Sequence, residues 1–279
     1  MKRVLKSSAW THTLTWTLAL SLLSSFSGFA RLQAAPIPFS TITAMTYTPP
    51  PPPDRGAPGN RGEGASRGCT ATPLENTNRS ASLMALVPEQ TVPEQPSDTT
   101  SDATSITQVW GLTSTAYPRL WFSVPYAPNQ ISAIEFVLQN DQDQLVYRTP
   151  IAVPATSGVM SVQIPSTASG LEINQSYHWF FKVRVLCEPD QTPTLNYVEG
   201  WIQRTQLDQA LSDRLTQATL QQQAELYAEN GIWYDALTTL AQLKLAQPDN
   251  EAIAQEWTDL LTSVGLTDMA TQPLIDLAL

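Results

Sequence analysis

The sequence predicts an α+β fold, in which an antiparallel β-sandwich of immunoglobulin or fibronectin type precedes a small C-terminal helical region. Short runs of β-branched and aromatic residues, separated by turn sequences, fill residues 107–206. No helical pattern interrupts these runs, which favours a sandwich over a sheet with helical crossovers. After residue 206 the apolar residues recur at intervals of three and four, and this spacing is typical of helices.

Six strands are predicted within the sandwich region. They are the runs "RLWFSVPY", "ISAIEFVLQN", "LVYRTPIAV", "GVMSVQIP", "SYHWFFKVRVLC" and "NYVEGWIQRT". In the fifth run, one face carries Tyr177, Trp179, Phe181, Val183 and Val185, and the other carries His178, Phe180, Lys182, Arg184 and Leu186. Because aromatic side chains occur on both faces, we expect this strand to be central in its sheet.

Three helical stretches are predicted in residues 207–279. The first follows the spacing of Leu207, Leu211, Leu215 and Ala218. The second runs from about residue 232 to residue 247 and is stopped by a proline. The third begins at an N-cap, Asp249 or Asn250, and ends at Gly265.

One helix pair in this region has the pattern of a tetratricopeptide repeat, centred on "YAENGIWYDAL". The matching small, aromatic, turn and apolar positions are Ala224, Tyr227, Gly231, Ala236, Leu240, Leu243 and Pro248. Small residues on both helices allow close approach. A single repeat cannot bury its own faces, so this pair must pack on the sandwich or on a partner.

The N-terminal part reads as targeting and connecting sequence. Residues 1–35 combine a basic start, an apolar run and small residues, which predicts a cleaved secretory signal; an uncleaved membrane anchor is the alternative. Residues 36–53 end in five prolines and are predicted to form a stiff tether. Residues 54–106 are predicted to be a Gly/Arg-rich loop, a short strand and a flexible loop over 90–105, packed on the sandwich.

The charge balance limits the partners. The chain has a formal net charge of −10. Residues 1–35 hold four of the fifteen basic residues and no acidic residue, so the processed chain would carry −14. Residues 205–279 are the most anionic part, with eleven acidic and two basic residues. Such a field disfavours nucleic acid, and without the signal no membrane span is expected.

Cys69 and Cys187 are the two cysteines of the chain. An even count in an exported protein predicts one disulfide between them. The alternative is a pair of buried free thiols.

Arg-Gly recurs three times just before Cys69, at Arg55, Arg61 and Arg67. Backbone amides and arginines of this stretch could cradle an anion or contact a partner. A dinucleotide loop is disfavoured because prolines rather than a strand precede the glycines. The plainer interpretation is an irregular loop that wraps the sandwich, with arginines paired to surface acids.

No recognisable catalytic, cofactor or metal constellation is present, so we expect a non-enzyme without a cofactor. His178 is the one histidine of the processed chain and lies within a predicted strand, where packing explains it better than catalysis. Asp141 and Asp143 could bind calcium, but a hairpin turn explains them equally well.

Several motifs together resemble an exported cyanobacterial family, the domain of unknown function 928. They are "GAPGNRGEGASRGC", "LMALVP", "WGLTSTAYPRLWFSVPY", "EFVLQNDQDQLVYRT", "YHWFFKVRVLC", "VEGWIQR" and "YAENGIWYDALTTLAQL". The resemblance covers roughly residues 54–266. It implies a location in the periplasm or outer envelope, and it brings no activity, substrate or catalytic residue.

Three functions follow as hypotheses. The first is a non-enzymatic envelope protein whose helical face docks another protein. The second is a glycan or envelope-polymer binder in which Trp110, Trp121 or Trp201 stack on sugars, with core packing as the alternative role of these tryptophans. The third is a hydrolase that uses paired carboxylates.

Overall fold

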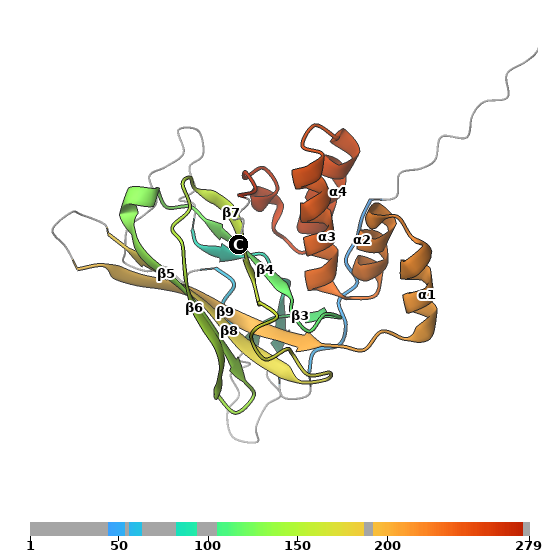
Figure 1. Ribbon diagram of the computed structural model, residues 1–279, viewed down its shortest axis with the longest axis horizontal. Coiled ribbons are helices and arrows are strands. Elements are labelled where there is room, and N and C mark those ends of the chain that lie inside the picture. The colour runs from blue at the N-terminus through green and yellow to red at the C-terminus, as the bar shows by residue number, and fades with distance from the viewer. Residues whose placement is uncertain (1–43, 54–55, 63–81, 94–104, 187–191, 276–279) are drawn as a thin grey trace, which may run out of the picture. The chain divides into compact units, whose positions relative to one another are not determined.

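The computed structural model describes residues 44–53, 56–62, 82–93, 105–186 and 192–275 (Figure 1). Within them the elements follow the predicted order of strands and then helices. The strands are β1 Met84–Ala85, β2 Glu89–Pro93, β3 Ser105–Thr113, β4 Arg119–Val124, β5 Ile131–Asn140, β6 Leu145–Ile151, β7 Gly158–Gln163, β8 Ser176–Val185 and β9 Thr194–Arg204. The helices are α1 Gln209–Gln217, α2 Leu220–Glu229, α3 Trp233–Ala246 and α4 Glu251–Ser263.

The strands form two sheets, with orders β2-β3-β9-β8-β5-β6 and β1-β4-β7. The prediction that β8 is a central strand is confirmed, because β8 lies between β9 and β5. The expectation of a purely antiparallel arrangement is wrong at one place: β3 and β9 pair in parallel from Trp110 and Trp201 onward. Strand direction leaves no mark on hydrophobic alternation, so the sequence pattern could not reveal it.

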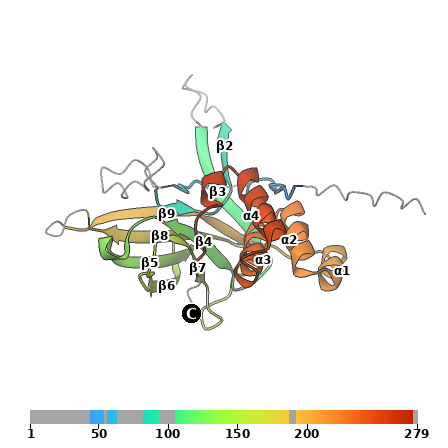
Figure 2. The same ribbon diagram turned by 90° about the horizontal axis from the view of Figure 1, so that it is seen from above.

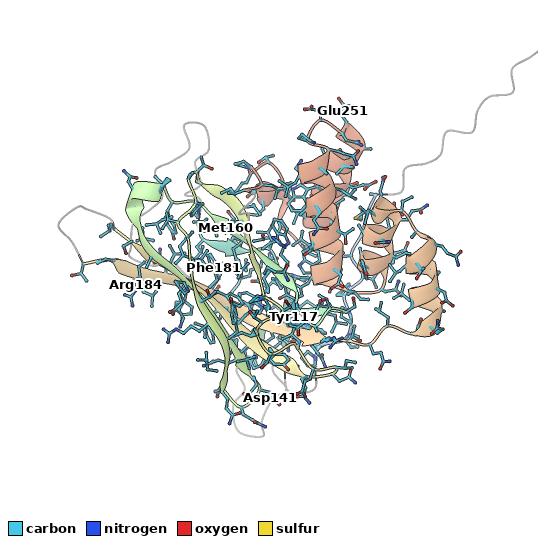
Figure 3. All side chains as sticks on the ribbon, in the orientation of Figure 1. Tyr117, Asp141, Met160, Phe181, Arg184 and Glu251 are labelled. Carbon is cyan, nitrogen blue, oxygen red and sulfur yellow. The ribbon has the colours of Figure 1, made fainter. Side chains whose placement is uncertain are left out.

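The two sheets pack face to face through aromatic side chains. Phe122 of β4 stacks on Phe181 of β8, with ring centroids 4.1 Å apart and planes within 9°. Trp179 meets the same Phe122 edge-on at 5.6 Å. Figure 3 shows Phe181 and Met160 in this interior, and both are fully buried. The inward face of β8 therefore forms the centre of the core, as its alternation predicts.

The helices pack against the sheets, and their buried side chains belong to the same hydrophobic core (Figure 2). Trp121 Nε1 donates to Thr238 Oγ1 of α3 over 3.1 Å, and Trp179 Nε1 donates to the Tyr234 hydroxyl over 3.0 Å. Trp233 Nε1 donates to the carbonyl of Leu86 over 2.8 Å. Each indole buries a large apolar surface and satisfies its one donor across the sheet–helix boundary, so α3 is tied to both sheets.

The predicted helix boundaries are confirmed where capping residues define them. The Asn250 side chain accepts from the backbone of Ala252 and Ile253, and α4 begins at Glu251. Gly265 has a φ of +74° just beyond the end of α4. The second predicted helix corresponds to α3, Trp233–Ala246. No helix of the described residues has the length and apolar character needed to cross a bilayer.

The predicted tether over residues 36–53 is wrong for its described part near Tyr47. Met45 and Tyr47 are each 6% exposed. The Tyr47 ring meets Trp233 edge-on at 5.0 Å, and Thr48 N donates to the Ala228 carbonyl over 3.1 Å. The proline run misled the prediction, because the apolar side chains just before it pack on the helices.

Because Gly231 has no side chain, residues 48–50 can lie close to the α2–α3 turn. Replacing Gly231 gives a first testable prediction. Gly231 and Gly265 have φ of +73° and +74°, so alanine at either costs about 1–2 kcal/mol of backbone strain. A Cβ at Gly231 would also lie 2.9 Å from the Thr48 carbonyl oxygen, whereas at Gly265 the nearest atom is 3.5 Å away. In urea unfolding, Gly231→Ala should lose at least about 1 kcal/mol more than Gly265→Ala. Equal losses would show that residues 48–50 do not pack against the α2–α3 turn.

The described residues 58–62 of the Arg-Gly stretch, together with residues 84–85 and 89–93, pair with strands of the two sheets. Asn60 exchanges two backbone hydrogen bonds with Glu199 of β9, while Val109 N of β3 donates to the Ala57 carbonyl. Residues 57–60 thus fill the gap where β3 and β9 diverge. The predicted flexible loop over 90–105 is wrong at its start, because β2 pairs with β3 from Glu89 to Pro93.

Candidate functional site

The outer face of the six-stranded sheet carries a cluster of basic and exposed apolar side chains. We define the sheet-face site by Arg148 of β6, Lys182 and Arg184 of β8, and Leu195 and Tyr197 of β9. Leu195 and Tyr197 are each 44% exposed. The cluster is unusual for this chain, which has a net charge of −10.

Strand register brings these residues together. Lys182 pairs directly with Tyr197, and Arg184 pairs with Leu195. On its other side, Lys182 pairs with Glu135 of β5. Residues directly opposite on neighbouring strands have Cβ atoms about 4.5–5.5 Å apart. Alternation sends these side chains outward while their neighbours on each strand enter the core, so the site is a consequence of the pleat.

One carboxylate lies among the three cations. Arg148 Nε and Nη2 donate to Glu135 Oε1 and Oε2 over 2.8 and 3.0 Å, a two-pronged ion pair. This bond is the main reason that the pKa of Glu135 is lowered, and the charges of Lys182 and Arg184 lower it further. Glu135 is thus ionised and neutralises one cation. Lys182 and Arg184 form no ion pair within the described residues, so the site keeps an excess positive charge.

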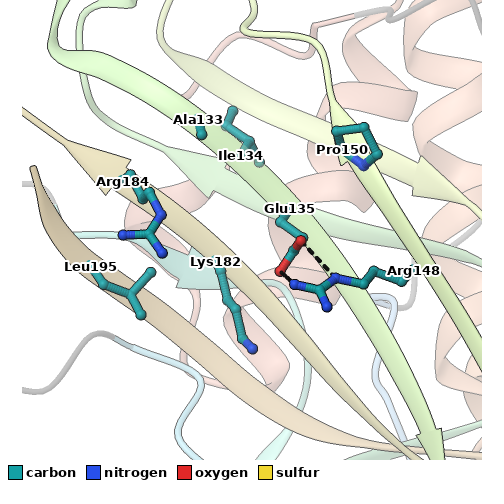
Figure 4. Close-up of a pocket in the computed structure, with 8 residues that line it drawn as sticks. All are labelled: Ala133, Ile134, Glu135, Arg148, Pro150, Lys182, Arg184 and Leu195. Atoms are coloured by element: carbon teal, nitrogen blue, oxygen red, sulfur yellow. Dashed lines mark hydrogen bonds and ion pairs between the residues drawn. The ribbon is translucent and has the colours of Figure 1, made fainter. Parts of the chain in front are cut away.

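These side chains surround an open hollow of about 280 Å³ (Figure 4). Figure 4 shows Glu135 between Lys182 and Arg148, with Arg184 beside Leu195. The wall is completed by Ala133, Ile134 and Pro150. An exposed hollow with two spare cations and apolar walls can hold an anionic group that has an apolar part beside it.

An aromatic row continues along the same face. The imidazole of His178 stacks on the indole of Trp201, with centroids 4.4 Å apart and planes within 8°. His178 Nε2 lies 3.1 Å from Glu199 Oε2, and the Lys182 ammonium lies 5.1 Å from the centre of the Phe180 ring. His178 is therefore a packed residue on a sheet face, as the sequence suggested.

The tryptophans predicted as sugar platforms do not share one surface. Trp110 and Trp121 are 4% and 2% exposed and belong to the core, so their predicted stacking role is wrong. Trp201 lies on the outer face, partly buried, and its Nε1 donates to the Pro58 carbonyl over 2.9 Å. Trp110 and Trp121 pack in the core because an indole side chain buries a large apolar area there.

Arg61 contacts groups of its own chain. Its Nη1 donates to the carbonyls of Val264 and Val87 over 2.8 and 3.3 Å, and its Nε lies 3.5 Å from Glu89 Oε2. It therefore clamps the last turn of α4 to the sheet, where a cation complements the helix C-terminus. The predicted Arg55 and Arg67, and the predicted Cys69–Cys187 disulfide, lie outside the described residues.

The residues predicted to pack the helix pair come together at the α2–α3 junction. Ala224, Ala236 and Leu240 are fully buried, and Leu243 is 7% exposed. The partly buried residue Tyr227 packs against the core cluster, whereas the predicted stop residue Pro248 is exposed beyond α3. The pair packs on the sandwich, which satisfies the need of a single helix pair for a neighbour.

Asp235 is a partly buried acid at the junction of sheet and helices. Its carboxylate accepts from Thr113 Oγ1 over 2.6 Å, from Ser114 N over 3.2 Å, and from Ser114 Oγ. Burial is the main cause that raises its pKa, and these hydrogen bonds oppose the shift. The oxygens are occupied by protein donors, so the arrangement fixes α3 to the end of β3.

Asp141 and Asp143 lie in the turn that connects β5 and β6. Asn140 Oδ1 accepts from the backbone of Gln142 and Gln144, and Asp143 has a φ of +59°. Across the described residues, no three His, Cys, Asp or Glu side chains are grouped so as to hold a metal ion. Turn geometry therefore accounts for Asp141 and Asp143.

Arg148, Leu195 and Tyr197 are not predicted from the sequence as site residues. Lys182 and Arg184 are predicted to share one face of their strand, and this is the signal that the sequence contains. Arg148 lies two strands away, and its membership depends on the pairing of β5 with both β6 and β8. The hydrophobic pattern of a single strand does not show which strands lie beside it or in which register.

Comparisons with known proteins identify a family. No curated protein and no solved structure matches the chain. A family model described as Domain of Unknown Function (DUF928) matches residues 62–274. This span includes both sheets, the helices and the sheet-face site. The chain therefore belongs to the DUF928 family.

Proposed function

We propose that this protein is an exported, non-enzymatic binding protein of the cell envelope that holds its partner through the sheet-face site. The observation that carries the proposal is the excess positive charge of Lys182 and Arg184 beside exposed Tyr197 and Leu195, on a chain that is otherwise strongly acidic. Surface clusters that combine cations with exposed apolar side chains are typical of binding sites.

Support for export comes from the amino-terminal sequence. Residues 1–35 have the basic start and interrupted apolar run of a secretory signal. The motifs that resemble the exported cyanobacterial family, the domain of unknown function 928, agree with this proposal. The envelope, periplasmic or outer, is accordingly the compartment proposed.

Binding is favoured over catalysis by the chemistry of the site. Glu135 is the carboxylate in the hollow, and Arg148 holds it in a two-pronged ion pair with a lowered pKa. A carboxylate in this state is a poor general base or acid, because catalytic carboxyls need a pKa near the working pH. The remaining side chains of the hollow are cationic or apolar and suit recognition.

The sheet face is favoured over the helical face as the docking surface. We interpret α2–α3 as a tetratricopeptide-like pair on an immunoglobulin-like sandwich, but its packing surface is already used. Trp233, Ala236 and Leu240 of α3 are fully buried against the rest of the chain.

Charge reversal tests the proposal. Purified processed protein should co-sediment with the isolated envelope fraction of its source, and Lys182→Glu/Arg184→Glu should reduce the bound fraction at least tenfold. Arg214→Glu/Lys244→Glu is the matched control, since it makes the same charge change on α1 and α3. Thermal unfolding of both variants checks their folding. Equal loss in the two variants would show a general charge effect and contradict the sheet-face site.

A further inference from the structure

We infer that the ligand of the sheet-face site is an acidic polysaccharide, a chain of sugar rings that carry carboxylate or sulfate groups. The inference rests on the proposed function and specifies its ligand. It follows from two properties of the site, spare cations and an exposed ring next to them, which are argued in turn.

The cations are placed to bind oxyanions along one line. Lys182 and Arg184 are two residues apart on β8, so they project from the same face about 7 Å apart. Neither is neutralised by an ion pair within the described residues, whereas Arg148 is paired with Glu135. The planar guanidinium of Arg184 can pair with both oxygens of a carboxylate or sulfate. Two neighbouring acidic groups of one polymer can therefore be bound together.

The ring is placed to bind the uncharged part of the same ligand. Tyr197 lies directly opposite Lys182 and is 44% exposed, and Leu195 extends the apolar strip beside Arg184. The C–H face of a sugar ring is apolar and packs on an aromatic face, while its acidic substituent lies at the ring edge. Tyr197 next to Lys182 reproduces this combination of an apolar face and an adjacent anion.

Other anionic polymers fit this surface less well. Nucleic acid carries a charge at every phosphate and would be repelled by the acidic chain. A peptide run of Asp and Glu alone matches the cations but offers no ring face to Tyr197. A polysaccharide with one acidic group on some of its rings satisfies both features at a lower charge density.

The test measures binding of the processed protein to four defined polymers: partly methyl-esterified polygalacturonate, a lightly substituted dextran sulfate, neutral dextran and polyglutamate. Polygalacturonate and dextran sulfate carry rings with anions, dextran has rings alone, and polyglutamate has anions alone. We expect at least one ring-bearing polyanion to bind at least tenfold more tightly than either dextran or polyglutamate. The comparison of the two polyanions shows whether carboxylate or sulfate is preferred.

Two variants assign the contributions. Tyr197→Ala should weaken binding of the preferred polysaccharide about tenfold and leave the weak binding of polyglutamate unchanged. Lys182→Glu/Arg184→Glu should weaken binding of both, and Arg214→Glu/Lys244→Glu should alter neither. Thermal unfolding confirms that each variant is folded.

Three results would overturn the inference. Polyglutamate that binds as tightly as the acidic polysaccharides would identify an acidic protein segment as the ligand class. Tyr197→Ala with unchanged affinity would remove the ring from the site. Absence of binding to all four polymers, while the envelope fraction still binds through Lys182 and Arg184, would refute the polysaccharide and leave the proposed function standing.

Discussion

Trp179→Ala is expected to lower the free energy of unfolding by about 3–5 kcal/mol, the largest loss that we predict for a single substitution. The indole is fully buried, meets Phe122 edge-on and donates to the Tyr234 hydroxyl of α3. Its removal empties the centre of the core where the two sheets and the helices meet. Urea unfolding at constant slope measures the loss.

Trp201→Ala provides the matched control. It removes the same side chain from the outer face of the neighbouring strand, where Trp201 stacks on His178 and is only partly buried. We expect less than half of the loss of Trp179→Ala, because little cavity forms at a partly exposed site. Equal losses would contradict the placement of Trp179 in a core shared by the sheets and the helices.

Asp235→Ala is the second large effect, and we expect a loss of about 1–3 kcal/mol. The substitution leaves the hydroxyls of Thr113 and Ser114 and the Ser114 amide without their acceptor at a partly buried position. Asp235→Asn keeps the shape and one acceptor oxygen, so it should be much less destabilising. If alanine and asparagine have the same small effect, the carboxylate does not anchor α3 to β3.

The same residue predicts a pH dependence. Burial raises the pKa of Asp235 above its ordinary value of 3.8, so the folded state binds its proton more tightly than the unfolded state. Stability from this group is complete below about pH 4 and is lost as the pH rises through the folded pKa. Asp235→Asn does not titrate, so it should gain stability relative to the unsubstituted protein as the pH rises above about 4. A stability difference that stays constant with pH would contradict the shift.

The predictability of the fold depends on how local its determinants are. The strand that became β5 is predicted to the residue, Ile131–Asn140, because turn sequences bound it on both sides. Asn250 and Gly265 mark the ends of α4 through capping, which is also local. The parallel β3–β9 pair and the burial of Tyr47 depend on partners far along the chain, and hydrophobic period contains no such information.

The site shows the same division. Alternation in β8 places Lys182 and Arg184 on the same face of the strand, and this shared face is visible in the sequence. Tyr197 and Arg148 join them only through the registers of β9 and β6. For Trp110 and Trp121 the sequence suggested a binding role that the structure does not support. Their aromatic rings suggested a sugar platform, but their strands place them in the core.

The most direct measurement of the central claim uses the two lysines of residues 36–279. Residues 36–279 contain Lys182, in the sheet-face site, and Lys244, on α3. Acetylation of the free protein and of the protein bound to the envelope fraction, read by mass spectrometry, compares the two positions in one experiment. Binding through the sheet face predicts that Lys182 becomes protected while Lys244 reacts as before. Protection of Lys244 with unchanged reaction at Lys182 would place the partner on the helices and contradict the account.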